Sequence, residues 1–255
     1  MSEPPDPISR LRPLLGTFVA IEIPGDCPLP TETLEAAFGA IGRVETLMHP
    51  QRDGSDVARI NAASVGQAIA VDAWTLEVLE LAQRLNRESG GAFDPCLPLG
   101  QGRMRDISLL DSCVTLRRRV ALDLGGIAKG YAVDRAVEEL RQRGASSGLV
   151  NAGGDLRVFG AAARTIQARR PDGGAVDIPL RDGAIAVSAP RAGASPPEHR
   201  GHYHGDTGTP VDGHGVLIVA PTAAEADALC KCALLCEPAL LGPLLQAHAA
   251  QLILP

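Results

Sequence analysis

The sequence predicts an α+β protein that forms one compact unit over residues 1–255. Short segments with strand-like alternation follow one another through hairpin turns, and the helical segments stand apart from them. Hydrophobic residues make up 45% of the chain, which is enough for a sizeable core, and 28 Gly and 20 Pro punctuate it with turns. No repeat period is visible, so we expect a single domain and not an array.

The first half of the chain is predicted to contain helices, short strands and two long connecting segments. Apolar residues at helical spacing indicate two helices, and alternation indicates three short strands. In chain order the predicted segments are a strand at 19–23, a helix at 34–47, a polar loop at 48–61, a helix at 72–89, a turn-rich segment at 90–102, and a hairpin of 114–116 with 120–124.

The second half is predicted to contain one long helix and several hairpins. Residues 127–143 have the clearest amphipathic pattern, and Gly144 follows as a stop signal. The remaining segments are strands around a Gly-Gly turn at 149–158, paired strands at 165–170 and 175–180, a strand at 184–188, a loop at 190–215, a strand at 216–220, and a helix at 222–235. Residues 238–255 carry no formal charge, but their Pro, Gly, Gln and His residues favour a buried terminal helix over a membrane span.

Composition excludes some classes of function. A formal net charge of −6 argues against a protein that coats nucleic acid or an anionic membrane, and 3% aromatic residues are too few for stacking along bases. Residues 1–10 are polar and Pro-rich, and no apolar stretch typical of a secretory signal follows them. We therefore expect a cytoplasmic protein. The six cysteines show no paired C-x-x-C spacing, and we interpret them as small buried apolar residues.

The segment LDLGGIAKGYAVDR, residues 122–135, is the richest in chemistry. A predicted strand ends at Gly125-Gly126, and a predicted helix that carries Lys129 follows. Glycine lets backbone N–H groups approach a phosphate, and the amino end of a helix favours an anion. The segment lacks the Walker A and dinucleotide fingerprints, so a plain tight turn with a solvated lysine remains the alternative.

Three other segments are candidates for a site. The turn NAGGD at 151–155 permits close backbone approach to a ligand, or is only a hairpin with an Asx bond. Asp227 either caps a helix or binds a hard cation. The loop EHRGHYHGDTGTPVDGH holds His199, His202, His204 and His214 beside Asp206 and Asp212, and provides metal ligands, a general base, or only a polar surface.

Together, these segments resemble the ApbE family of FAD:protein FMN transferases. The motif at 122–135 is intact, GGAFDP at 90–95 matches almost letter for letter, and LVNAGGDLRVFG at 149–160 carries the Gly-Gly-Asp element. The weaker marks lie at 15–17, 55–61, 184–186 and 219–229, in the family's order over nearly the whole chain. The resemblance implies the family's T-fold-related fold, with mixed sheets and packed helices.

The resemblance also implies a reaction. The family binds FAD with a magnesium ion at the pyrophosphate, a Thr hydroxyl of a target flavoprotein attacks the phosphorus on the FMN side, and AMP leaves. The implied FAD-contacting residues are Met48, Gly125, Gly126, Ile127, Ala128, Lys129, Asp134, Gly153, Gly154, Asp155 and Ser188. The implied metal ligands are Gly126, through its carbonyl, and Asp227, with Cys230 and Lys231 at neighbouring positions; His204, His202 and Asp206 are the candidates for the general base.

The chain departs from the family pattern at four places. Lys231 stands where the family often has a metal-binding Thr, and Val187-Ser188-Ala189 replaces Thr-Ser-Gly. HYHGDTG at 202–208 replaces the family's His-x-x-Asp-Pro-x-Thr-Gly, and His49-Pro50 follows Met48 where a Ser is usual. Three alternatives to the transferase therefore stay open: an FAD-binding paralogue without transfer, an FAD pyrophosphatase that gives FMN and AMP, and a zinc hydrolase built on His199, His202 and His204.

Overall fold

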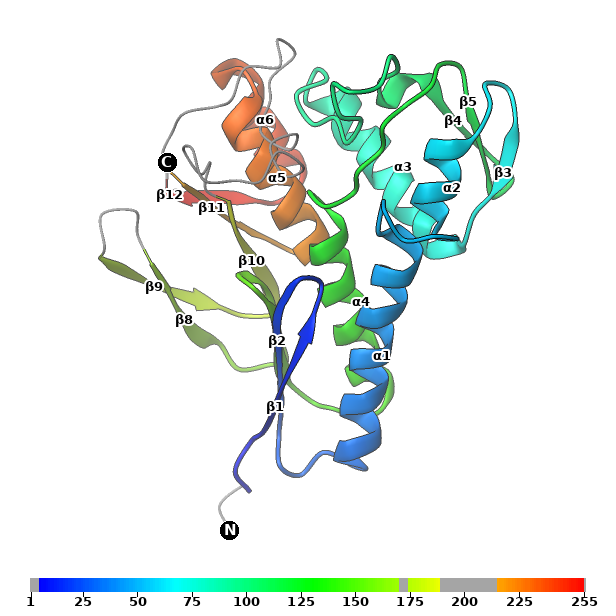
Figure 1. Ribbon diagram of the computed structural model, residues 1–255. Helices are drawn as coiled ribbons and strands as arrows, with labels where there is room; N and C mark the ends of the chain where they lie inside the picture. Colours follow the sequence, from blue (N-terminus) through cyan, green and yellow to red (C-terminus); the bar gives the residue numbers. More distant parts are fainter. Residues whose placement is uncertain (1–4, 170–173, 189–214, 255) are drawn as a thin grey trace.

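The computed structural model describes residues 5–169, 174–188 and 215–254, and its architecture is α+β as predicted (Figure 1). Its main feature in this part of the chain is a seven-stranded sheet in the order β1-β2-β6-β7-β10-β11-β12, with every neighbouring pair antiparallel. These strands are β1 (Ile8–Leu14), β2 (Thr17–Ile23), β6 (Gly148–Ala152), β7 (Asp155–Phe159), β10 (Gly183–Ser188), β11 (Val216–Ala220) and β12 (Gln251–Leu254).

Three helices cover one face of this sheet. Helix α4 (Ala128–Gln142) packs on β6 and β7, and α5 (Ala223–Leu235) packs on β10 and β11. Helix α1 (Pro30–Met48) runs along α4 (Figure 1) and also contacts β1. The buried residues of α4 include 132–133, 136–137 and 140, which is the spacing that forms one apolar stripe along the helix.

The smaller elements surround one end of this helical layer. They are α2 (Asp56–Ala62), β3 (Ala68–Ala70), α3 (Ala73–Glu88), a 3₁₀ turn (Met104–Asp106), β4 (Ile107–Leu110) and β5 (Cys113–Leu116), with β5 between β3 and β4 in a separate sheet. Strands β8 (Arg164–Arg169) and β9 (Ala175–Leu180) form a two-stranded ribbon, and α6 (Pro238–Ala247) follows α5. Among the described residues, no helix is long and apolar enough to cross a membrane.

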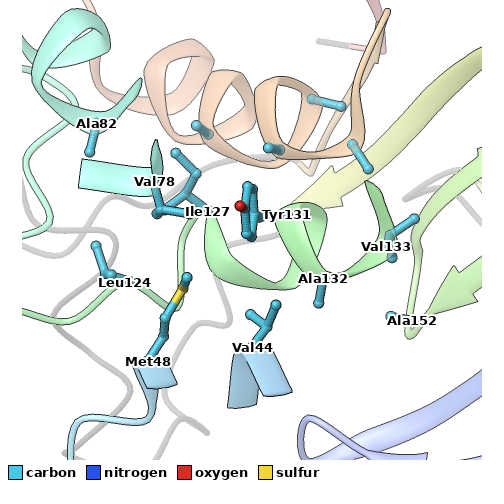
Figure 2. Packing of buried hydrophobic residues seen from close by; sticks show 14 of the residues in the cluster. Val44, Met48, Val78, Ala82, Leu124, Ile127, Tyr131, Ala132, Val133 and Ala152 are labelled. Carbon is cyan, nitrogen blue, oxygen red and sulfur yellow. The ribbon is translucent and has the colours of Figure 1, made fainter. Parts of the chain in front are cut away.

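A continuous apolar core connects α1 with α4 and with the segment that precedes α4. Figure 2 shows Met48, at the end of α1, pointing toward Leu124, with Val44 one turn earlier beside α4. Met48 is 3% exposed, and Leu124 and Ile127 are fully buried. The segment that enters α4 is therefore held from one side by apolar packing, which makes the position of the turn before it well defined.

The predictions for residues 48–61 and 120–124 were wrong. The polar loop predicted at 48–61 contains α2, whose amino end is capped by Ser55: its hydroxyl accepts a hydrogen bond from the Ala58 N–H at 3.0 Å. The strand predicted at 120–124 is absent, and Leu122 forms only an isolated bridge with Cys96. The side-chain amide of Asn61 binds both backbone groups of Leu122, at 2.7 and 2.9 Å, and so takes the place of a partner strand.

The hairpin and the terminal helix also differ from the prediction. The partner of β5 is β4, and Asp111 and Ser112 turn between them with φ of 48° and 61°. The terminal segment divides into α6, in which only Leu244 is buried, and β12, which pairs with β11. Ala249, at φ 47°, reverses the chain between them, so the uncharged terminal segment does not form one buried helix.

Candidate active site

The Gly125-Gly126 turn leads directly into the amino end of α4. The Asp123 carboxylate accepts a hydrogen bond from the Gly125 N–H at 2.8 Å, and the Leu124 carbonyl accepts from the Ala128 N–H at 2.8 Å. The Asp123 side chain thus closes the turn, as expected for the tight turn that the sequence allowed. Gly125 is exposed and Gly126 is buried, so the turn has one open side next to the first turn of the helix.

Lys129 is not a solvated lysine. Its ammonium lies 2.5 Å from the carboxylate of Asp155, whose side chain is 2% exposed, and Lys129 itself is partly exposed. Asp155 begins β7 directly after Gly153 and Gly154, which have φ of 66° and 108° and form the two-residue turn of the β6–β7 hairpin. The turn also contains the predicted Asx bond, from the Gly154 N–H to the Asn151 side chain at 3.0 Å.

A second ion pair lies beside the first. Asp227 and Lys231 are one turn apart on α5; their side chains form a salt bridge, and Asp227 is fully buried. The Lys231 ammonium also donates to the Ser188 hydroxyl at 3.0 Å, at the end of β10. The other oxygen of Asp227 accepts from the Gly130 N–H of α4 at 3.3 Å, so this carboxylate joins α4 to α5.

The two ion pairs interact electrostatically. Burial and then the charge of Asp227 raise the pKa of Asp155 to about 6. Burial also opposes ionisation of Asp227, but the cations of Lys231 and Lys129 outweigh it and hold the pKa of Asp227 below its usual value. Burial lowers the pKa of Lys129, but the carboxylates of Asp227 and Asp155 outweigh burial and raise it overall.

These are the chain's two lysines. The other 22 of its 24 basic residues are arginines, and the lysines at 129 and 231 both lie in this cluster. An ammonium is a compact, strongly hydrated point charge, whereas a guanidinium is a planar fork. The cluster therefore concentrates the one type of cation that the rest of the chain does not use.

A cavity of about 330 Å³ opens next to the cluster. Gly126 and Lys231 form part of its wall, together with Asp123 and the loop 89–96 that contains the GGAFDP motif. Asp94 of this motif accepts hydrogen bonds from the N–H groups of Cys96 and Met104 at 2.9 and 3.1 Å. Burial raises the pKa of Asp94. Residues from four separate segments thus meet around one concave space.

Asp134 is placed away from this cavity wall. Its carboxylate accepts from Arg157 at 2.7 Å and from the N–H groups of Ala223 and Ala224 at 2.9 Å each, and it is 6% exposed. Through these bonds Asp134 holds the amino end of α5 against α4 and β7. A contact between Asp134 and FAD stays a prediction from the resemblance.

The remaining predicted residues divide into three groups. Met48 and Ile127 are core residues (Figure 2). Ala128 begins α4 in a partly buried position. The candidate bases His202, His204 and Asp206 lie outside the described residues, as do the three histidines of the zinc alternative. No cluster of three or more His, Cys, Asp or Glu side chains with metal-site geometry occurs in the part of the chain that the structure describes.

The donor set around Asp227 does not fit a magnesium ion. Mg²⁺ requires hard oxygen ligands in near-octahedral geometry, but one Asp227 oxygen contacts the Lys231 ammonium and the other accepts from Gly130. Two unit charges 4 Å apart repel by about 4 kcal/mol at an effective dielectric constant near 20, and a divalent ion roughly doubles this cost beside Lys231. The Cys230 thiol, whose pKa burial raises to about 12, points instead to the Ala186 carbonyl at 3.3 Å.

Comparison with known proteins identifies the family. The sequence model of the ApbE family matches residues 15–253. The chain belongs to the ApbE family. An FAD:protein FMN transferase of Treponema pallidum is 27% identical over 281 aligned residues, covering 87% of this chain and 76% of that protein. A relative of the same name from Haemophilus influenzae is 30% identical and covers 78% of this chain and 70% of its own length.

The fold agrees with solved ApbE structures. A flavinyl transferase ApbE of Pseudomonas stutzeri, in its apo form, superposes with a TM-score of 0.83 at 20% identity, covering 98% of this chain and 91% of that one. The ApbE protein of Thermotoga maritima gives a TM-score of 0.78 at 25% identity, over 90% and 86%. The predicted family fold is thereby confirmed.

Sequence reasoning missed two residues of the site. Gly130 approaches the backbone of α5 so closely that a Cβ there would lie 2.7 Å from the Ala224 nitrogen and closer still to Ala223. A glycine inside a strongly periodic helix was the available signal. Asp94 was quoted only as part of a motif, although a carboxylate between Phe and Pro in a turn-rich segment is a candidate for binding backbone N–H groups.

Proposed function

We propose that this protein is an FAD:protein FMN transferase, which moves FMN from FAD to a Thr of a target flavoprotein and releases AMP. One observation carries the proposal: in an ApbE-family chain, both lysines pair with buried carboxylates in one cluster beside a cavity, whose wall includes Gly126 and Lys231. Relatives that bear this activity in their names align with most of the chain.

The proposed chemistry is a displacement at phosphorus. The acceptor Thr oxygen forms a bond to the FMN-side phosphorus of FAD, the bond from that phosphorus to the bridging oxygen breaks, and AMP leaves with that oxygen. The Thr proton passes to a base, for which we propose one of His202, His204 and Asp206. The products are FMN in phosphoester linkage to Thr, and AMP.

This chain's residues would act mainly by position and charge. The amino end of α4 would direct the positive end of a helix dipole toward the phosphates. Lys129 adds a positive charge in the first turn of the same helix, and Asp155 holds its ammonium at 2.5 Å. Because Asp155 begins β7 just after a tight turn, its carboxylate has little freedom, and the lysine is held in one place.

The cavity beside Gly126 and Lys231 would receive one part of the dinucleotide. Its volume of about 330 Å³ is at the lower end of small-molecule sites, so FAD would extend beyond it over the exposed Gly125 side of the turn. The apolar packing of Leu124 and Ile127 below the turn makes this platform rigid.

The test is a transfer assay with mass spectrometry. The purified protein is incubated with FAD and a panel of flavoprotein subunits, and the covalent FMN adduct and the released AMP are measured in the same samples. We expect AMP and adduct in equal amounts, with the adduct on one Thr, and loss of both when that Thr is replaced by Val. Lys129→Met is expected to abolish transfer, and Glu139→Gln, on the exposed side of α4, to leave it unchanged.

Other outcomes contradict the transferase and identify the alternatives. Retained FAD without AMP release, across acceptors that a related transferase modifies in parallel, indicates a binding protein. AMP release with free FMN, equal with and without acceptor, indicates FAD hydrolysis. Zinc found in stoichiometric amount in the purified protein, without FAD binding, indicates the hydrolase built on the histidine loop.

A further inference from the structure

Asp227 requires a positive charge next to it. Its carboxylate is fully buried, and an ionised carboxylate without water is stable only when it is paired and hydrogen-bonded. Lys231 provides this charge from the same helix, one turn further on, and its side chain is only 9% exposed. The counterion of Asp227 is therefore part of the polypeptide and does not depend on the solution.

The position of the Lys231 ammonium is the second observation. It lies between α5, the end of β10 and the glycine turn: it donates to the Ser188 hydroxyl at 3.0 Å, and its stem lies 3.4 Å from the place of a Cβ on Gly126. Gly126 and Lys231 share one wall of the cavity. The Lys231 side chain thus contacts both residues to which the family resemblance assigns a metal ion: its ammonium pairs with Asp227, and its stem lies against Gly126.

We infer that the Lys231 ammonium replaces a divalent cation at the FAD pyrophosphate, so that this chain binds FAD without Mg²⁺. The inference rests on the proposed function for the identity of the ligand. The tethered cation is always present beside Asp227, whereas a metal ion must be bound from solution. It also excludes the metal, since a divalent ion on the same carboxylate would have to displace it.

The consequence is specific to position 231. A Thr there would provide a hydroxyl oxygen in place of the ammonium and remove the salt-bridge partner of Asp227, and both changes favour a hard cation. Replacement of Lys129 by Thr removes the other lysine but leaves the pair of Asp227 and Lys231 intact. The same substitution at the two lysines is therefore expected to give different metal responses.

The first experiment measures FAD binding to the full chain by flavin fluorescence, in excess EDTA and in excess Mg²⁺. For the wild type we expect the same Kd in both conditions within about twofold. For Lys231→Thr we expect FAD binding in EDTA to weaken by about tenfold or more and to recover with Mg²⁺. For Lys129→Thr we expect weaker binding that is equal in both conditions. A wild-type Kd that falls about tenfold on adding Mg²⁺ overturns the inference.

The second experiment uses a metal alone and needs no flavin. Mn²⁺ binding to the protein without FAD is followed by electron paramagnetic resonance, and thermal unfolding is measured with and without Mn²⁺. We expect Lys231→Thr to bind one Mn²⁺ and to unfold at a higher temperature with it, and the wild type to do neither. If Lys231→Thr folds poorly without metal, the wild type alone still tests the inference. The wild type must then leave Mn²⁺ unbound.

The two arms separate this inference from the proposed function. If the wild type binds FAD in neither condition, the proposed function fails, and the Mn²⁺ arm still decides whether Lys231 holds the cation position. Saturable binding of one Mn²⁺ to the wild type, abolished by Asp227→Asn, overturns the inference even if FAD is transferred. A Lys231→Thr variant that binds FAD as well as the wild type in EDTA overturns it too.

Discussion

Gly130→Ala is expected to separate helices α4 and α5. A Cβ at this position would lie 2.7 Å from the Ala224 nitrogen and nearer still to the Ala223 carbonyl, whereas real Cβ contacts under 3.0 Å are essentially never seen. The obstructing atoms are backbone on both sides, so no side chain can rotate away. The same movement would lengthen the 3.3 Å hydrogen bond between the Gly130 N–H and Asp227.

The magnitude follows from opposing contributions. Overpacking in a well-packed interior costs about 1–3 kcal/mol, and the lost hydrogen bond to a buried carboxylate adds about 1–2 kcal/mol. Replacement of Gly by Ala inside a helix returns at most about 1 kcal/mol through backbone entropy. We therefore expect a net loss of about 2 kcal/mol, which for a chain of this size lowers Tm by about 4–8 °C.

The assay is thermal and urea unfolding of Gly130→Ala beside a matched control, Gly39→Ala. Gly39 is exposed in the middle of α1, and a Cβ there would meet nothing within 4 Å. The control is expected to gain about 0.5–1 kcal/mol, the propensity term alone. If both variants are stabilised equally, the backbone contact between α4 and α5 is not as close as the structure has it, and the reasoning is refuted.

Three further predictions concern single contacts. Asp134→Asn breaks a buried ion pair with Arg157 and is expected to cost about 3–5 kcal/mol in urea unfolding, against under about 0.5 kcal/mol for Glu139→Gln on the surface of the same helix; equal effects would contradict the bridging role. Ser55→Ala removes the cap of α2 and is expected to cost about 1 kcal/mol, with Ser64→Ala, in the exposed turn after that helix, as the neutral control. Asp155 has its pKa raised from 3.8 to about 6, so its folded form binds the proton more tightly than the unfolded chain, and its stabilising contribution is complete below pH 3.8 and lost as the pH rises through about 6. The stability of the wild type relative to Asp155→Asn should therefore fall between these two pH values, and a difference that is constant with pH would show that Asp155 does not titrate there.

The elements with a strong local pattern could be predicted from the sequence. Residues 127–143 carry a stripe of apolar residues and a Gly stop, and the helix found there is Ala128–Gln142. The Gly-Gly turn at 153–154 needs positive φ at both residues, which glycine alone adopts readily, and the β6–β7 hairpin follows from it. In both places local preference and tertiary packing agree.

One error occurred where a side chain takes the place of a partner strand. Asn61 binds both backbone groups of Leu122, so the apolar residues at 120–124 need no neighbouring strand. The charged cluster was also only half predictable. Asp155 and Lys129 were each singled out from a motif, but their pairing across 26 positions follows from the antiparallel sheet and the packing of α4 on β7.

The buried ion pair of Asp227 and Lys231 is better explained by function than by stability. A buried ion pair is weak evidence for stability, because well-packed apolar residues of similar volume are often as stable or more so. The pair nevertheless lies at the cavity wall, beside a second pair and against a glycine turn, and it uses one of the chain's two lysines. A cation paired with a carboxylate one turn away is expensive to bury, and an approaching anion would give it a use beyond the contacts of Asp227 with Gly130 and of Lys231 with Ser188. Position 231 is therefore the position at which the inference of a metal-independent FAD site is tested most directly.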